Sequence, residues 1–162
     1  MKILTEVTSK TGIKGLREDN VLFMISIRLK DLCNQYGVFI MTATQLNADY
    51  ITAQQYDQNL LRGAKSIADK IDCGMIMLEC NADDWAALDN VITQGGFERP
   101  TIKISVYKNR RGRYKSILLW CKANRGTCKI EPMFATNYQM ELVPIEDMKI
   151  NVKPKKVEAS AF

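Results

Sequence analysis

The stretch from Thr101 to Trp120, TIKISVYKNRRGRYKSILLW, most constrains the fold, because it reads as two strands joined by a polar turn. The apolar residues that mark the two strands are Ile102, Ile104 and Val106, then Ile117, Leu118 and Leu119. Between them, Asn109 to Arg113 form a polar turn around Gly112. A hairpin is a stiff support, so side chains on its turn are presented outward with little freedom to retreat.

The turn is strongly basic. Its five cations within eight positions are Lys108, Arg110, Arg111, Arg113 and Lys115. One interpretation is a solvated hairpin end whose charges protect the edge of a sheet. The other is a cationic finger directed at phosphate groups. The charges alone leave both interpretations open.

Composition limits the possible functions. The 162 residues are 46% hydrophobic, which suits one globular domain, and the formal charge of +5 is a mild bias compatible with nucleic acid or nucleotide partners. The chain has no histidine, so Ser-His-Asp and Cys-His catalysis and histidine-containing zinc sites are excluded. Any catalysis needs carboxylates, cations or a polarised water.

The cysteines and the apolar runs indicate a location. The five cysteines form no C-x-x-C pair, and most lie in apolar runs typical of buried thiols in a reducing compartment. The first ten residues lack the apolar core of a signal peptide, and no run reaches membrane-spanning length. We expect a soluble, cytoplasmic protein without a membrane partner.

Periodicity divides the chain into a lead-in loop over 1–18, one domain over 19–145 and a flexible tail over 146–162. A helix is predicted from Asp19 to about Tyr36, with one buried stripe formed by Leu22, Ile25, Leu29, Leu32, Cys33 and Tyr36. Val38–Met41 then reads as a fully buried strand of the kind found in parallel sheets. Residues 48–59 are predicted to be a loop.

The second half alternates in the same way. We expect a short helix from Asn59 to Ile71, a buried strand at Met75–Leu78, a helix around Trp85–Thr93 and a short strand at Lys129–Met133. Helix, glycine and buried strand in succession indicate an α/β fold. In such sheets ligands lie beyond the carboxyl ends of the strands, where Gln45 and Asn47 fall.

Three blocks in this order resemble the C-terminal half of the RecA-like motor of DnaB-type hexameric replicative helicases. They are MTATQLN at Met41–Asn47, LLRGAKSIADKIDCGMIML at Leu60–Leu78, and YKNRRGRYKSI at Tyr107–Ile117. The resemblance covers roughly residues 20–135. It implies an incomplete RecA-like (P-loop NTPase) core, with a mostly parallel sheet flanked by helices and a C-terminal β-hairpin.

The resemblance also implies roles for residues of the first two blocks. Gln45 matches the glutamine that senses the γ-phosphate, and Asn47 belongs to the same motif near the nucleotide. Arg62 and Ser66 match positions beside the central channel, and the loop before them matches a segment that touches single-stranded DNA. The DNA-binding residues implied in this way are Asn59, Arg62, Lys65 and Ser66. The sequence departs from the family pattern at Gly63-Ala64-Lys65.

The third block implies a finger that acts in trans. Lys108 and Arg110 match the family's Lys-x-Arg pair, and strand alternation places both on one face of the hairpin. In a hexameric ring this pair reaches the neighbouring subunit's nucleotide, where an arginine spreads over the charge of the transferred phosphoryl group. Arg111 stands where the family has a neutral residue, and it is expected near phosphate.

The phosphate loop, the catalytic glutamate and the Mg²⁺-binding aspartate of such a motor lie upstream of the helix predicted at 19–36. The resemblance therefore implies a part of an ATP-dependent DNA helicase, whose ATP and Mg²⁺ are held mainly by a missing N-terminal motor half. Its partners would be that half, neighbouring ring subunits and single-stranded DNA. A non-enzymatic nucleic-acid binder or helicase-assembly modulator stays open as an alternative, as does another RecA-like ATPase such as a recombinase.

Overall fold

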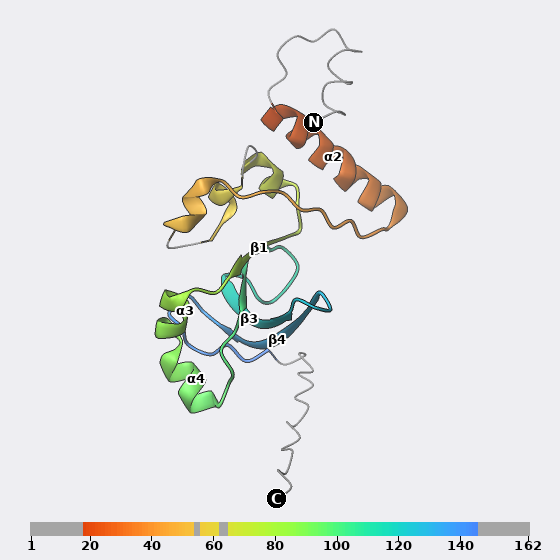
Figure 1. Ribbon diagram of the computed structural model, residues 1–162. Helices are drawn as coiled ribbons and strands as arrows, with labels where there is room; N and C mark the ends of the chain where they lie inside the picture. Colours follow the sequence, from red (N-terminus) through yellow and green to blue (C-terminus); the bar gives the residue numbers. More distant parts are fainter. Residues whose placement is uncertain (1–17, 54–55, 62–64, 146–162) are drawn as a thin grey trace, which may run out of the picture. The chain divides into compact units, whose positions relative to one another are not determined.

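The computed structural model describes residues 18–53, 56–61 and 65–145 (Figure 1). The lead-in loop predicted up to residue 17 and the tail predicted from residue 146 lie outside the described residues. The elements are helix α2 (Glu18–Tyr36), the 3-10 helices η1 (Ala48–Ile51), η2 (Gln58–Leu60) and η3 (Lys65–Asp69), strand β1 (Cys73–Glu79), helices α3 (Ala82–Ala87) and α4 (Asp89–Gly95), and strands β2 (Ile102–Asn109), β3 (Ile117–Asn124) and β4 (Lys129–Thr136).

The described residues form two compact units. Unit 1 contains the chain up to Met77 together with Ser105–Ser116, and unit 2 contains Leu78–Ile104 together with the chain from Ile117 onward. Unit 1 therefore holds α2, the three 3-10 helices and the basic turn. Unit 2 holds α3, α4, β3 and β4, and strands β1 and β2 contribute residues to both units.

The sheet has four strands in the order β1-β2-β3-β4, so every strand pairs with its neighbour in sequence. The β1–β2 ladder is antiparallel, because Arg110 N donates to Asp72 O at one end and Cys80 N donates to Thr101 O at the other. Two further bonds, from Thr101 N to Cys121 O and from Ser116 N to Val106 O, show that β2 and β3 are also antiparallel.

The pairing of β3 with β4 is antiparallel as well, with a bulge between Trp120 and Cys121. The predicted fold class is therefore wrong: the sheet is entirely antiparallel, where a mostly parallel RecA-like sheet was expected. For the β2–β3 and β3–β4 pairs the physical reason is the length of the connections; the β1–β2 connection is longer and contains α3 and α4. Residues 110–116 and 125–128 are turns that return the chain beside the strand it has just left, whereas parallel neighbours need a long crossover.

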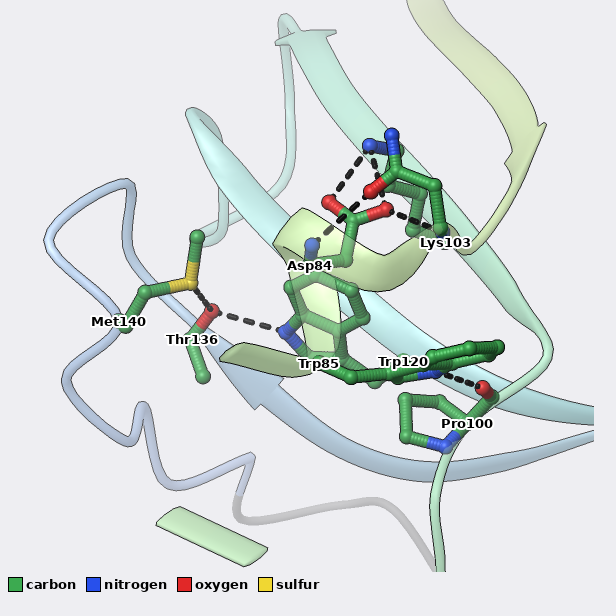
Figure 2. Close-up of polar contacts among 8 residues, drawn as sticks. Asp84, Trp85, Pro100, Lys103, Trp120, Thr136 and Met140 are labelled. Carbon is green, nitrogen blue, oxygen red and sulfur yellow. Dashed lines mark hydrogen bonds and ion pairs between the residues drawn. The ribbon is translucent and has the colours of Figure 1, made fainter. Parts of the chain in front are cut away.

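The core of unit 2 is aromatic. Phe134 stacks on Phe97, with ring centroids 4.5 Å apart, and on Trp120 at 6.4 Å. Trp120 is fully buried, and its indole N–H donates to the Thr136 hydroxyl at 2.9 Å (Figure 2). The hydrogen bond from Trp120 to Thr136 is thus a buried polar contact between β3 and β4 inside an apolar core. The Thr136 hydroxyl also contacts the Met140 sulfur.

Helix α3 starts at a capping box, in which the Asn81 side chain accepts from Asp84 N and the Asp84 carboxylate accepts from Asn81 N. The same carboxylate accepts two bonds from Lys103 Nζ, at 2.7 and 2.9 Å (Figure 2). The indole of Trp85 donates to Pro100 O at 2.9 Å and ties the helix to the approach to β2. The predicted helix around Trp85–Thr93 is thus present as α3 and α4.

Helix α2 agrees with the predicted bounds to within one residue, but the predicted buried stripe is wrong. None of its six residues is buried: Ile25, Leu32 and Tyr36 are exposed, and the other three are half-buried. The segment Val38–Met41 forms no strand, and Phe39 and Met41 are 83% and 76% exposed. Four apolar residues in a row predict a buried strand only where neighbours pair with them, and no strand within the described ranges pairs with this segment.

Strand β1 corresponds to the predicted strand at Met75–Leu78, but it is not buried on both faces. Gly74 and Ile76 are buried, whereas Met75 and Met77 are exposed. The Tyr107 ring lies so close to Gly74 that a Cβ there would come within 2.3 Å of it. The described helices include none with the combination of length and apolarity that crossing a bilayer requires.

Candidate functional site

The basic turn between β2 and β3 is held in shape by the side chain of Asn109. Its amide nitrogen donates to Tyr114 O at 2.9 Å, and its carbonyl oxygen accepts from Gly112 N at 2.9 Å. A Cβ on Gly112 would collide with this side chain at about 2.0 Å, which explains the glycine. The turn closes at Ser116, which has a positive φ of 57° and donates its N–H to Val106 O.

Lys108 does not extend away from the protein. Its ammonium group donates to the main-chain carbonyl of Ala68, near the end of η3, and its side chain is only partly accessible. Ala68 itself is fully buried, so this carbonyl has limited access to water. The first residue of the predicted finger pair therefore acts in this structure as a cap on η3.

Arg110 follows the last residue of β2 and is half exposed. Its main-chain N–H donates to Asp72 O at 2.8 Å, and its Nη2 donates to Asp69 O at 3.0 Å. Its Nη1 lies 3.8 Å from the Asp72 carboxylate. The guanidinium is thus tied to the segment that joins η3 to β1.

Asp72 is the carboxylate around which the cations gather. Lys30 of α2 donates to its Oδ2 at 2.5 Å. This hydrogen bond is the main cause that lowers the pKa of Asp72 below its ordinary value of 3.8, with the charges of Lys30, Arg111 and Arg110 acting in the same direction. Asp72 is therefore ionised at neutral pH.

The remaining cations of the turn are exposed. Arg111, Arg113 and Lys115 all lie on the accessible part of the segment between Arg110 and Ser116. Arg111 stands close enough to Asp72 to influence its ionisation. The turn therefore presents positive charge to solvent, while Lys108 and Arg110 contact their own chain.

The predicted phosphate sensor lies on an extended segment. Gln45 is exposed, and Asn47 caps η1 by accepting from Asp49 N at 3.2 Å. Asn47 also donates from its main chain to Leu60 O at 2.8 Å and from its amide to Asn59 O at 3.1 Å. An isolated bridge between Leu46 and Leu61 completes this junction of the first and second blocks.

The predicted DNA-binding residues are only partly described. Arg62 lies outside the described residues, and Lys65 and Ser66 belong to η3 but their side chains are not described. Asn59 lies in η2, exposed, with its N–H and amide directed to the Asp57 carboxylate. Of these four side chains the structure describes only that of Asn59.

Hydrogen bonds nevertheless join the three blocks inside unit 1. The first block pairs with the start of the second at Leu46–Leu61, and the second contacts the third through the bonds from Lys108 to Ala68 and from Arg110 to Asp69. The residues predicted to contact phosphate and DNA lie on segments that touch one another directly.

Sequence reasoning missed Lys30 and Asp72. Their ion pair joins residues 42 positions apart, and although Asp72 falls within the second block, the resemblance assigns it no role. An aspartate just before an apolar strand is common, so only the fold shows that a lysine and an arginine converge on this one. The one local signal was the Lys-x-Arg spacing, which identified Arg110 but not its partner.

The site has no obvious place for a metal ion. Among the described residues, no three or more cysteine, aspartate or glutamate side chains come together as metal ligands would. The described donor set therefore does not fit Mg²⁺. A hollow of about 460 Å³ lies in unit 2, lined by Ala82, Trp85, Ala86, Asp89 and Arg99, and it contains none of the predicted site residues.

Comparison with known proteins gives one relative of undefined activity. The chain is 38% identical over 155 residues to the SPbeta prophage-derived uncharacterized protein YorI of Bacillus subtilis (strain 168). The match covers 93% of this chain but only 30% of YorI, so the chain spans less than a third of the length of that relative. No protein-family model and no solved structure matches the chain.

Proposed function

We propose that the chain is part of a DNA helicase motor that couples ATP hydrolysis to movement along single-stranded DNA. The observation that carries the proposal is the direct contact between its three blocks in unit 1. Lys108 and Arg110 of the third block hydrogen-bond to Ala68 and Asp69, in the 3-10 helix that also contains the predicted DNA-binding residues Lys65 and Ser66. A motor needs such a mechanical connection between groups that contact nucleotide and groups that contact DNA.

The roles follow the resemblance. Arg110 is the trans-acting residue, because its guanidinium is half exposed and ends at the surface of the turn. Lys108 positions the turn on η3. Gln45 senses phosphate from an exposed segment that is joined to the DNA-facing block at Leu46–Leu61. ATP and Mg²⁺ would be held mainly by another polypeptide segment, and the location would be the cytoplasm.

Exposed apolar side chains support a partner for unit 1. The large exposed ones in this unit are Met24, Ile25, Leu32, Tyr36, Val38, Phe39, Met41, Tyr50, Ile51, Met75 and Met77. Isolated exposed apolar residues are ordinary, but a set of this size in one unit is typical of an interaction surface. The occupant we propose is the rest of a YorI-like polypeptide, of which the chain matches only 30%. The prophage origin in the name of YorI agrees with a phage-type helicase.

A chimera tests the proposal: YorI in which this chain replaces the matched segment, assayed for ATP hydrolysis with and without single-stranded DNA. Arg110→Ala should lower kcat on the order of 10³-fold or more, as for arginine fingers in other NTPases. Lys115→Ala removes the same charge from the same turn and should leave kcat nearly unchanged. Full turnover in Arg110→Ala would exclude the finger.

A second candidate is a non-enzymatic nucleic-acid binder, favoured by the three exposed cations Arg111, Arg113 and Lys115. It predicts that the 162-residue chain binds single-stranded DNA without nucleotide, with log affinity falling linearly with log salt. Replacement of the three exposed cations by glutamine should reduce that slope by about two to three. Binding that is independent of salt would exclude this candidate.

A further inference from the structure

The carboxylate of Asp72 lies among cations that come from separate parts of unit 1. Lys30 on α2 approaches its Oδ2 at 2.5 Å, and Nη1 of Arg110 approaches its Oδ1 at 3.8 Å. Arg111 adds a third positive charge close enough to favour the ionised carboxylate. Lys30, Asp72, Arg110 and Arg111 are called the Asp72 cluster below.

The cluster and its surroundings carry excess positive charge. The further ionisable residues on the adjoining segment are Asp69 and Lys70, and the Lys70 ammonium lies 5.5 Å from the centre of the Phe23 ring. Three cations, Lys30, Arg110 and Arg111, therefore act on the single carboxylate of Asp72. A dianionic or trianionic ligand would balance this charge better than Asp72 does alone.

The groups are also accessible. The side chains of Lys30, Asp72 and Arg110 are 28%, 43% and 50% exposed, so solvent reaches the place where the charges meet. Ion pairs at such exposure contribute little to stability, because water competes for both partners. Replacing the Asp72 carboxylate by another anion therefore costs little free energy. An arginine can bind a phosphate with two parallel hydrogen bonds.

We propose that Asp72 is an internal counter-ion in a polyphosphate-binding site formed by Lys30, Arg110 and Arg111, and that the phosphates of a nucleoside triphosphate displace it. This inference rests on the proposed function, in which Arg110 meets a nucleotide. Lys108 keeps its bond to Ala68 O and stays in place. Arg110 is the residue that changes partners, leaving the Asp72 carboxylate and Asp69 O for phosphate oxygens.

The displacement has a consequence for η3. Asp69 O and the Asp72 carboxylate both lie on the connection from η3 to β1, and Arg110 ties them together. When Arg110 turns to phosphate, this connection loses two of its contacts, while the main-chain bond from Arg110 N to Asp72 O remains. Nucleotide would thereby loosen the segment predicted to face DNA.

Calorimetry on the 162-residue chain with sodium tripolyphosphate tests the site. Asp72→Asn should bind about twofold to fivefold more tightly than wild type, the factor corresponding to one exposed ion pair. Arg110→Gln and Lys30→Gln should each weaken binding by about tenfold. Lys115→Gln removes the same charge from the exposed turn and should weaken binding less than about twofold.

A second measurement does not depend on any variant. Tripolyphosphate should shift the NMR signals of the Asp72 side-chain carboxyl and Arg110 Nε in the wild-type chain, and leave the Lys108 signals unchanged. If Asp72→Asn binds tripolyphosphate no more tightly than wild type, Asp72 is not a counter-ion that the ligand displaces. If Lys115→Gln and Arg110→Gln weaken tripolyphosphate binding equally, the Asp72 cluster is not the binding site. If tripolyphosphate binds as expected while the Arg110→Ala chimera keeps full ATPase activity, the helicase proposal fails and the anion site stands.

Discussion

The ammonium group of Lys108 donates to the main-chain carbonyl of Ala68, a residue with no accessible surface, and so fixes the end of β2 against η3. This contact crosses 40 positions of sequence and lies wholly within unit 1. It gives the two cations of the Lys-x-Arg pair different tasks, because Lys108 caps a helix end while Arg110 remains half exposed.

The first prediction follows from this contact. Lys108→Met keeps most of the aliphatic side chain but removes the donor, leaving the Ala68 carbonyl without its partner. The free energy of unfolding should fall by about 1–3 kcal/mol, the usual cost of a buried group left unsatisfied. Urea denaturation measures it. Lys115→Met, at an exposed position of the same turn, should change stability by less than about 0.5 kcal/mol, and equal effects of the two variants would contradict the capping role.

Local patterns predicted some of the elements. The predicted helix from Asn59 to Ile71 is wrong, because the described part of it contains the 3-10 helices η2 and η3, and η1 lies in the predicted loop over 48–59. Alternating apolar residues identified β2, a run of apolar residues after the polar turn identified β3, and α2 ends at Tyr36 beside Gly37, which has a positive φ of 62°. Each of these features depends on residues that are close together in the sequence, within a single turn or a single strand. The chemistry of a few neighbours was enough to predict them.

Features that depend on distant pairing could not be predicted in this way. Val38–Met41 has the composition of a buried parallel strand, but burial requires partners on both sides, and composition does not reveal them. Strand direction likewise depends on where the connection returns the chain. The same limit applies to Asp72, whose partners Lys30 and Arg110 lie 42 and 38 positions away.

The second prediction concerns the buried ion pair of Lys103 and Asp84, whose side chains are 5% and 12% exposed. Lys103→Met leaves the Asp84 carboxylate buried beside the start of α3 without its cation. The free energy of unfolding should fall by about 3–5 kcal/mol, since removing one partner of a buried pair leaves an uncompensated charge. Chemical denaturation followed by circular dichroism gives the value.

Two further variants isolate the charge. Lys103→Met combined with Asp84→Asn removes both charges and keeps an acceptor for the Asn81 N–H, so it should recover at least about 1 kcal/mol. Lys122→Met breaks the exposed pair with Glu98 and should cost about 0–1 kcal/mol. A double variant that is no more stable than Lys103→Met would show that packing, and not charge, accounts for the loss.

The third prediction concerns Trp120 and Thr136, both fully buried and joined by a 2.9 Å hydrogen bond. Thr136→Val keeps the shape but removes the acceptor, which leaves the indole N–H unsatisfied at a cost of about 1–3 kcal/mol. Thr136→Ser keeps the acceptor and loses one methyl group, at a cost of about 1 kcal/mol. Thermal unfolding should therefore rank serine above valine, and the reverse order would show that the methyl group matters more than the hydrogen bond.

The last prediction concerns thiol reactivity. Burial raises the pKa of Cys80 to about 12 and that of Cys121 to about 11, whereas Cys73 and Cys128 are exposed. A raised pKa keeps a thiol protonated, so at pH 8 the thiolate fraction of Cys121 is on the order of 10⁻³ and that of Cys80 on the order of 10⁻⁴. Iodoacetamide at pH 8 should modify Cys73 and Cys128 first, as peptide mass spectrometry would show.

Unfolding supplies the control for this prediction, because a cysteine in a denatured chain has an ordinary pKa and full access. In guanidinium chloride, Cys80 and Cys121 should react at the rates of Cys73 and Cys128. Raising the pH of the native protein from 8 to 9 should increase the rate at Cys80 and Cys121 about tenfold while both stay mostly protonated. Equal native rates at Cys121 and Cys128 would contradict the buried position of Cys121 beside the β3 bulge.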